Sequence, residues 1–369
     1  MNFGYVRYYS MQQFQNALVL LPFRMPLIIV SSSGAKRWGI DSLLLELQHT
    51  EKILWFSRID SNPTQQTVAR ARQIIKGKDI DGIVAIGGGS AMDLAKQVSA
   101  FSGMKDLKAP GALIEAVKEK SYLKNKDNAI PVIAVPTTAG TGSEVTQWAT
   151  LWDSDSGMKY SVDAPWLKPK TVWMVPELTV SLPAKLTLAA GLDAVCQAVE
   201  AYWARETNPL SKALSIRSIQ LITESLISVL LEPDNLRLRE SLCTASLIAG
   251  LSFSQTKTTA CHSISYPLTA QFGIEHGFAV AITLAPVAAI NAQKVDITEI
   301  EALFMQYGGI QNWLDTVCGN ILTLRLSNFG ITKADLGGIV ECAFTGGRMD
   351  NNPVDLSPGM VKDILTTVL

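Results

Sequence analysis

Short apolar runs alternate with helical spacing in the first half of the chain, and each run ends in a turn of small or polar residues. A continuous apolar run of about five residues is typical of a strand that is buried on both faces of a parallel sheet. Residues 64–76 have the spacing of an amphipathic helix. Strand, turn and helix in repetition predict a doubly wound α/β domain with sites at the carboxyl ends of its strands. The predicted strands are residues 26–30, 52–56, 82–86 and 129–135.

The pattern changes from about residue 182 onward. Strand-like runs become scarce, and long stretches such as 210–231 and 237–251 carry Ala, Leu, Ile and Ser at helical spacing. We therefore expect an all-helical second domain, with the seam at residues 177–183. The predicted domains are 1–180, an α/β domain with a parallel Rossmann-like sheet that binds a dinucleotide, and 181–369, a helical domain that binds metal and substrate.

Composition and charge narrow the class of partner. The 369 residues, 47% of them hydrophobic, can fill two domain cores. Thirty-two basic and 33 acidic residues give a net charge of −1, which removes the electrostatic basis for binding nucleic acid or an anionic membrane. The five cysteines are scattered without CxxC spacing, as expected in a reducing compartment. With no uninterrupted apolar run of roughly 18 residues and no signal-peptide pattern, we expect a cytoplasmic protein.

Two clusters of small residues follow predicted strands. Gly87, Gly88 and Gly89 precede Ser90 between a strand and a helix, where missing side chains and free N–H groups suit a diphosphate. The stretch 136–144 adds four hydroxyls and two glycines after the next strand. Each cluster could also be a plain turn that binds nothing. Their shared position in one domain favours nucleotide binding, with both clusters facing the same crevice.

A candidate metal site lies in the helical half. His262 and His276 are 14 residues apart, and Pro267 and Gly273 between them predict two helical pieces whose joining turn brings both imidazoles inward. Asp193 and Gln197 lie at i and i+4 on one helix face. A carboxylate, two imidazoles and an amide oxygen are a plausible ligand set for a divalent cation, although spacing alone leaves a purely structural role open.

Four strings in this order carry a resemblance to a known family. The sequence resembles the iron-dependent (group III) alcohol dehydrogenases over about two hundred residues. The resemblance implies a dehydroquinate synthase-like fold, in which NAD(P) and a divalent metal, Fe²⁺ or Zn²⁺, meet between a nucleotide-binding domain and a helical domain. It also implies a dimer or larger assembly. The strings are GGGSAMDLAK (87–96), PTTAGTGSEVT (136–146), GLDAVCQAVEAY (191–202) and HSISYPLTAQFGIEHG (262–277).

The resemblance assigns roles residue by residue. Asp193, His262 and His276 match three of the four family metal ligands, and Gln197 stands where the fourth is normally a histidine. Tyr266 stands where many members have a further histidine close to the substrate. Some relatives, the maleylacetate reductases, work without metal. The cofactor-binding residues that the resemblance implies are Gly87, Gly88, Gly89 and Ser90 at the pyrophosphate, Thr137, Thr138 and Thr141 along the cofactor, and Lys159 near the ribose and nicotinamide.

Finer similarity lies in residues 256–268, which together with Gln197 look most like the phosphonoacetaldehyde reductase branch. That branch would reduce 2-phosphonoacetaldehyde to 2-hydroxyethylphosphonate. A phosphonate dianion needs a cationic partner, for which Lys257 is the candidate with Arg205 or Lys159 assisting, and a solvated surface lysine is the alternative. Lys257 and Tyr266 are therefore the candidate catalytic residues, with Tyr266 also a candidate proton relay.

The loop after the first strand bears on the choice of cofactor. NAD-specific sites usually place a carboxylate on the ribose 2′-OH. Residues 30–37 contain no acid and offer three serines, among them Ser32, followed by Lys36 and Arg37. The loop therefore predicts NADP(H) over NAD(H).

Together these features predict a metal-assisted, NAD(P)H-dependent enzyme that reduces a small aldehyde to a primary alcohol, or catalyses the reverse oxidation. Two alternatives stay open at this point. One is a metal-free reductase of the maleylacetate type, and the other is a nucleotide-binding homologue that has lost catalysis.

Overall fold

The computed structural model describes residues 4–105, 107, 109–319 and 321–369. The chain forms two compact units. The first consists of the chain up to Thr138 together with Ser143–Ser181, and the second of Ala139–Gly142 and Leu182–Leu369. A four-residue segment of the first half thus belongs to the helical unit.

The first unit is built on a six-stranded parallel sheet. The four predicted strands are present, which confirms the predicted α/β class. Two further strands complete one edge; they are only four residues long, and one of them is mostly exposed, so neither gives a clear apolar run. In sheet order the strands are β1 (Gly4–Arg7), β8 (Thr171–Met174), β5 (Val132–Pro136), β4 (Gly82–Gly87), β2 (Pro26–Ile29) and β3 (Leu54–Phe56).

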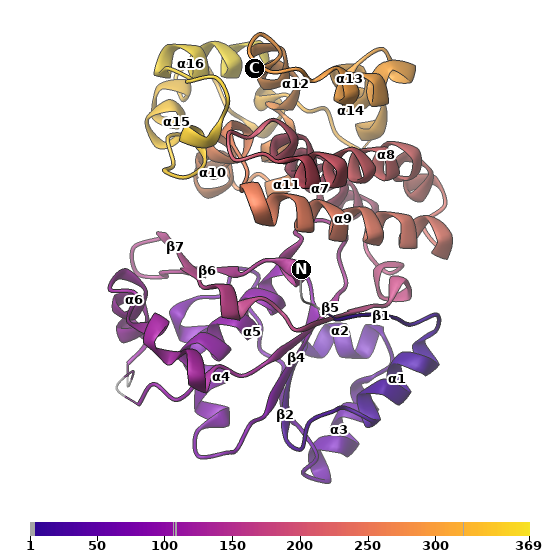
Figure 1. Ribbon diagram of the computed structural model, residues 1–369, viewed down its shortest axis with the longest axis vertical. Coiled ribbons are helices and arrows are strands. Elements are labelled where there is room, and N and C mark those ends of the chain that lie inside the picture. The colour runs from indigo at the N-terminus through magenta and orange to yellow at the C-terminus, as the bar shows by residue number, and fades with distance from the viewer. Residues whose placement is uncertain (1–3, 106, 108, 320) are drawn as a thin grey trace. The chain divides into compact units, whose positions relative to one another are not determined.

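Helices cover both faces of this sheet, as Figure 1 shows. Because side chains alternate along a strand, Ile83 and Ala85 of β4 point to one face, while Val84 and Ile86 point to the other. Both faces are buried, which explains why the central strands are continuously apolar. The first face packs on α4 (Gln65–Ile75), α5 (Gly89–Phe101) and α6 (Pro110–Lys118); the second packs on α1 (Met11–Val19), α2 (Ser32–Arg37) and α3 (Asp41–His49).

A small antiparallel hairpin also belongs to the first unit. It consists of β6 (Trp148–Trp152) and β7 (Lys159–Asp163), and its Leu151 and Val162 join the apolar cluster of α5. The sequence analysis did not predict this hairpin, because its exposed positions carry polar residues and its buried positions alternate over only five residues.

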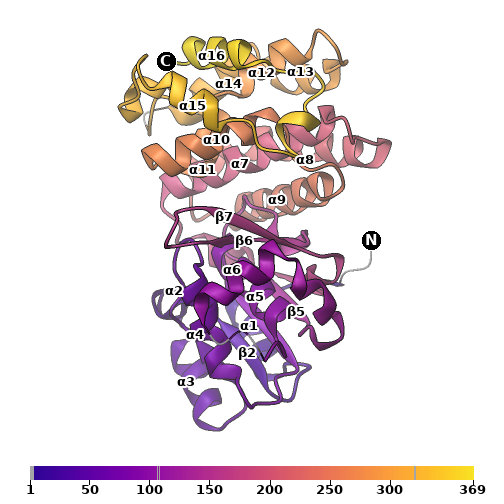
Figure 2. The same cartoon turned by 90° about the vertical axis from the view of Figure 1, so that its left-hand side faces the viewer.

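The second unit is helical, as predicted, and contains no strand among its described residues. The long helix α7 runs through its core, with most side chains buried, and α8 and α9 pack beside it (Figure 2). The predicted helices 210–231 and 237–251 correspond to α8 and α9. The helices are α7 (Ala184–Trp203), α8 (Pro209–Leu231), α9 (Leu236–Thr256), α10 (Ala260–Phe272), α11 (His276–Ala281), α12 (Leu284–Asn291), α13 (Thr298–Phe304), α14 (Ile310–Cys318), α15 (Leu336–Cys342) and α16 (Pro358–Thr367).

One helix, α8, is long and apolar enough to cross a membrane by length and composition. Half of its most apolar window is buried inside the structure, where α8 packs on α7 and α9. A core helix of this kind passes the same test as a membrane span.

Candidate functional site

Three helices of the second unit bring a carboxylate and two imidazoles together. The Oδ1 atom of Asp193, on α7, lies 3.4 Å from Nε2 of His262 on α10 and 3.8 Å from Nε2 of His276 at the start of α11. One ligand atom from each residue lies within 4.8 Å of the others. The predicted break between the histidines is present, since α10 ends at Phe272 and is capped by Gly273 with φ of 67°. Pro267 lies inside α10 instead of at that break.

Two buried side-chain oxygens of α7 have no hydrogen-bond donor among the described residues, and this suits a bound cation. Asp193 and Gln197, one turn apart on α7, are 5% and 4% exposed. Within the described part of the chain, Asp193 Oδ1 and Gln197 Oε1 are buried and accept no hydrogen bond. Burying an oxygen that accepts no hydrogen bond raises the free energy of the folded state, unless a cation lies beside it. These four side chains therefore suit a divalent cation bound by one carboxylate, two imidazoles and an amide oxygen.

Glu200 holds the His262 imidazole from the side away from Asp193. Its carboxylate is fully buried and contacts His262 Nδ1 through Oε2. Its Oε1 accepts from the Thr259 hydroxyl at 2.9 Å and from the backbone N–H groups of Cys261 at 2.7 Å and His262 at 3.3 Å. A carboxylate on Nδ1 selects the tautomer whose Nε2 is free to bind metal.

The pKa values of His262 and Glu200 are shifted from their ordinary values. Burial opposes protonation of His262, but the Glu200 charge and the Asp193 and Glu200 carboxylates that face its two ring nitrogens outweigh it and raise the pKa of His262 to about 9. Burial also works against ionised Glu200, yet His262 and the donors around the carboxylate hold the pKa of Glu200 below its ordinary value. The buried carboxylates of Asp193 and Glu200 lie on either side of His262. Their negative charge is therefore stabilised by a positive charge nearby, either a proton or a bound cation.

Neighbouring thiols do not compete as ligands. Cys196 and Cys261 are fully buried, and burial, followed by the Glu200 charge, raises the pKa of each thiol well above its ordinary value. The thiolate is the form that binds metal, so these neutral thiols act as small apolar side chains.

Tyr266 lies at the edge of the cluster on α10. Its ring stacks on the His276 imidazole, with centroids 6.3 Å apart and an interplanar angle of 12°. Tyr266 is half-buried, and the His276 side chain is 40% exposed, so this side of the cluster is the one that solvent reaches.

The glycine turn and the threonines that follow β5 are adjacent in the first unit. The N–H of Thr137 donates to the carbonyl of Gly87 at 3.0 Å, and a Cβ on Gly88 would lie 3.2 Å from the Thr138 hydroxyl. A Cβ on Gly87 would approach Ala91 to 2.6 Å, so this turn has no room for a side chain. The first N–H groups of α5 lack partners in their own helix, which suits a diphosphate. The hydroxyl of Ser90 is used inside the protein, where it donates to the Ser61 carbonyl.

The remaining predicted cofactor residues are dispersed. Thr141 is exposed in the segment Ala139–Gly142, which belongs to the helical unit. Lys159 is exposed on β7 of the hairpin. Ser32 is exposed in the first turn of α2, after the N-cap Ser31, and Lys36 and Arg37 are exposed in its last turn.

Comparison with known proteins agrees with this architecture. The family model described as iron-containing alcohol dehydrogenase matches residues 6–176, and the model of the family's C-terminal part matches residues 187–369. The chain belongs to the iron-containing alcohol dehydrogenase family.

Relatives within the iron-containing alcohol dehydrogenases differ in what their names say they act on. A choline dehydrogenase of Bacillus subtilis is 30% identical over 72% of this chain and 65% of its own length. A phosphonoacetaldehyde reductase of Streptomyces viridochromogenes is 34% identical over 63% of this chain and 58% of its own length. The chain thus spans less than two thirds of either relative. The crystal structure of a sulfoacetaldehyde reductase from Bifidobacterium kashiwanohense in complex with NAD⁺ has a TM-score of 0.84 and 25% identity, over 100% of this chain and 97% of that one.

The sequence analysis did not single out Glu200 beside the cluster, nor a second group of charged residues, Asp93, Lys96 and Glu144, in the first unit. Glu200 carries a detectable signal, since it follows Asp193 by seven residues and Gln197 by three, and so shares their helix face. The second group lies in the first unit, where Lys96 and Glu144 are buried and Asp93 is half-buried. These residues lie within the two recognised motifs, but their burial depends on packing from other elements.

These charged residues fix residues 143–148, the segment that follows Thr137, Thr138 and Thr141. The Lys96 ammonium donates to the Ser143 hydroxyl at 2.9 Å and the Trp148 carbonyl at 2.9 Å, while Asp93 accepts from Ser143 at 2.9 Å. Burial lowers the pKa of Lys96 to about 8, against the opposing charges of Asp93 and Glu144. Burial raises the pKa of Glu144 to about 7. The group therefore anchors residues 143–148 at a cost in buried charge.

Proposed function

We propose that the protein is a metal-assisted, NAD(P)H-dependent reductase of a small anionic aldehyde, with 2-phosphonoacetaldehyde as the first candidate. The observation that carries the proposal is the convergence of Asp193, His262 and His276, together with the buried oxygen of Gln197, one turn after Asp193 on α7, which has no hydrogen-bond partner in the part of the chain that the structure describes. Membership of a family of alcohol dehydrogenases supports the reaction type. Two relatives named for phosphonoacetaldehyde and sulfoacetaldehyde support an anionic substrate.

The reaction adds a hydride, which is a proton with two electrons, to the carbonyl carbon and a proton to the oxygen. When bound, the reduced nicotinamide supplies the hydride, and the divalent cation supplies a Lewis acid that polarises the carbonyl. Asp193, Gln197, His262 and His276 hold the cation, and Glu200 fixes the tautomer of His262. Tyr266 donates the proton to the alcohol oxygen from its place against His276.

The cofactor elements are assigned to the first unit and its neighbouring loop. Gly87, Gly88 and Gly89 leave their backbone open to the pyrophosphate, and Ser90 contributes its N–H. Thr137, Thr138 and Thr141 line the cofactor, and Lys159 lies near the ribose and nicotinamide.

We also propose a preference for NADP(H), which rests on the α2 region. The Ser32 hydroxyl and the exposed cations of Lys36 and Arg37 suit a 2′-phosphate, and residues 30–37 hold no carboxylate that would repel it. Comparison of kcat/KM with NADPH and NADH tests this assignment, and a clear preference for NADH would show that it is wrong.

The decisive experiment is a panel of aldehydes assayed with NADPH, with chelator and with added Fe²⁺ or Zn²⁺. Metal-assisted reduction predicts turnover of phosphonoacetaldehyde that chelator removes and metal restores. Light scattering of the same sample checks the proposed dimer or larger assembly.

A metal-free reductase is the second candidate, favoured by Gln197 in place of an imidazole. Elemental analysis of the purified protein separates the two functions. Chelator-resistant turnover with metal well below one ion per chain would establish the metal-free reaction. Absence of NADPH oxidation with every aldehyde would indicate a homologue that has lost catalysis.

A further inference from the structure

Lys257 has a backbone conformation that residues with side chains rarely adopt. It ends α9 with φ of 62° and ψ of 177°, while its N–H still donates to the Phe253 carbonyl at 2.7 Å. This region of backbone space is populated almost only by glycine. A residue stays there only when the surrounding structure enforces it, so the neighbours of Lys257 must supply that restraint.

The restraint comes from the amide of Asn351. This side chain is 7% exposed, and its Nδ2 donates to the carbonyl of Thr256 at 2.7 Å and to that of Thr258 at 3.1 Å. The two carbonyls belong to the residues on either side of Lys257. The Asn351 amide therefore fixes the peptide unit that precedes Lys257 and the carbonyl of the residue that follows it. The carbonyl of Lys257 itself accepts from the Thr256 hydroxyl at 2.8 Å.

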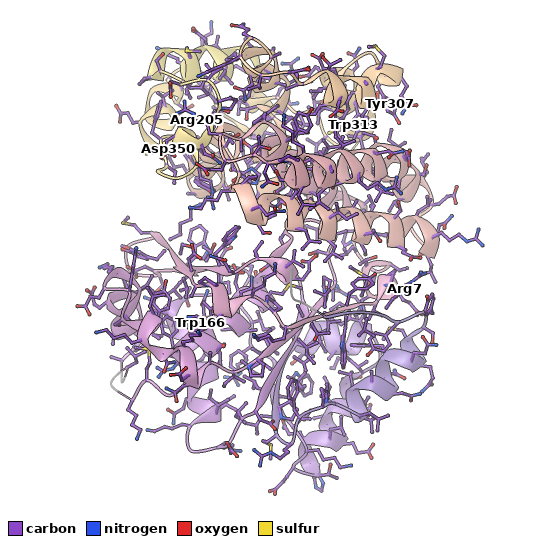
Figure 3. All side chains as sticks on the ribbon, viewed as in Figure 1. Arg7, Trp166, Arg205, Tyr307, Trp313 and Asp350 are labelled. Atoms are coloured by element: carbon purple, nitrogen blue, oxygen red, sulfur yellow. The ribbon has the colours of Figure 1, made fainter. Side chains whose placement is uncertain are left out.

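Asn351 is itself fixed to the end of α7. Its carbonyl accepts from the N–H of Arg205 at 2.9 Å, and its Oδ1 accepts from the N–H of Glu206 at 3.4 Å. Figure 3 shows Arg205 and Asp350 on the same side of the helical unit. The donors and acceptors of Asn351 are thus committed to holding the residues around Lys257.

In this conformation the Lys257 side chain reaches the loop after α15. A Cβ placed on Gly347 would lie 3.8 Å from Lys257 Nζ. The same loop is tied to α10, the helix that carries His262, because the N–H of Thr345 donates to the Ser263 hydroxyl at 2.9 Å, and Ser263 follows His262. Among the residues that the structure describes, no carboxylate forms an ion pair with Lys257. Its charge is therefore available to an anion.

We propose that Asn351 is a positioning residue for the anionic end of the substrate: its amide bridges the carbonyls that flank Lys257 and holds the ammonium toward Gly347. The proposal rests on the proposed function, because it names the group that selects an anionic aldehyde. Glycine would fill this backbone position without strain, so the presence of a lysine here points to a use of its charge.

The strain can be tested without any assay of activity. Lys257→Ala keeps a Cβ in the glycine-type region, whereas Lys257→Gly removes it. We expect Lys257→Gly to melt at a higher temperature than Lys257→Ala, the reverse of the usual order of these residues at unstrained positions. A higher melting temperature for Lys257→Ala would show that the lysine backbone is not strained and would overturn the proposal.

The use of the charge is tested by a ratio of specificities. The ratio divides kcat/KM for phosphonoacetaldehyde by kcat/KM for propanal, a neutral aldehyde. Removing one charge-assisted hydrogen bond should lower it by about tenfold to a hundredfold, mainly through KM for phosphonoacetaldehyde. We expect this loss in Lys257→Met and in Asn351→Ala. The control Asn328→Ala, which removes an exposed amide that donates to the Thr323 carbonyl at 3.2 Å, should leave the ratio unchanged.

A double variant distinguishes positioning from a general structural role. If Asn351 acts through the lysine, Asn351→Ala in the Lys257→Met background lowers the ratio no further. Additive losses would overturn the positioning role. Should Asn351→Ala not fold, Asn351→Ser, which keeps one donor, replaces it. If Lys257→Met still reduces propanal and its ratio of specificities is unchanged, the anion site is refuted but the proposed function is not. If the unmodified protein reduces no aldehyde, the proposed function itself is refuted.

Discussion

Replacing Glu200 with glutamine tests how the metal cluster is assembled. All three donors from Thr259, Cys261 and the His262 backbone converge on Oε1, and only His262 Nδ1 faces Oε2. The glutamine oxygen must occupy the Oε1 position, because an NH₂ group there would confront three donors. The NH₂ group then faces Nδ1, which has to accept, so the proton moves to Nε2.

The expected magnitude follows from this change of tautomer. With Nε2 protonated, His262 cannot bind metal until the amide or the imidazole turns away from its preferred contact. Loss of such an outer carboxylate typically lowers metal affinity by about 10- to 100-fold. This corresponds to about 1.4–2.8 kcal/mol of binding free energy.

Calorimetric titration of metal-free protein with Zn²⁺ measures the affinity, and ¹⁵N NMR of the imidazole identifies the tautomer. Glu206→Gln is the matched control, because Glu206 is an exposed carboxylate just beyond the same helix and should leave both readouts unchanged. If folded Glu200→Gln binds Zn²⁺ within about twofold of the unmodified protein, the role given to Glu200 is wrong.

Three further predictions concern ligand number, packing and pH. Gln197→His supplies an imidazole in place of an amide oxygen, so Zn²⁺ should bind about tenfold more tightly or better in the same titration; unchanged affinity would place residue 197 outside the ligand set. Gly277→Ala would bring a Cβ to 1.8 Å from the Ala189 carbonyl oxygen, beside His276. We expect it to lower the free energy of unfolding by about 1–3 kcal/mol in urea titrations and to weaken metal binding, and a neutral result would contradict the close approach of α11 to α7. Because burial raises the pKa of Glu144 to about 7, protonated Glu144 contributes stability that is complete below its unfolded pKa near 4.5 and is lost as the pH rises through 7. Glu144→Gln stays neutral, so its urea midpoint relative to the unmodified protein should rise between pH 5 and pH 7.5; a constant difference would rule out this titration.

The sequence was most informative where local pattern and burial coincide. The central strands, buried on both faces, are continuous apolar runs, and the glycine turn after β4 is visible because no side chain fits there. The pairing of Asp193 with Gln197 follows from helix periodicity alone. The edge strand β1 and its neighbour β8 were missed, since a strand of four residues carries too little pattern to detect.

Features that arise from distant contacts could not be read in this way. The residues next to Lys257 in the sequence do not predict its glycine-type backbone conformation. The side chain that restrains this conformation is Asn351, which lies 94 residues later in the chain. The burial of Lys96 likewise depends on partners about 50 residues away. The meeting of His262 with Asp193 was expected from the family resemblance and from the helix break, while the exact partners of each ring nitrogen required coordinates.

The four residues Ala139–Gly142 have a consequence for dissecting this protein. Gly140 and Gly142 press against Ala190 and Gly250 so closely that an added Cβ would come within 2.8 Å and 2.6 Å of their backbone atoms. A truncated fragment that starts at residue 182 would lack residues 139–142 and would expose to solvent the backbone of α7 and α9 that these residues cover. Splitting the gene at the apparent seam should therefore yield a poorly behaved C-terminal piece, and a circular permutant or a fragment with the loop grafted back is the sounder route to an isolated helical half.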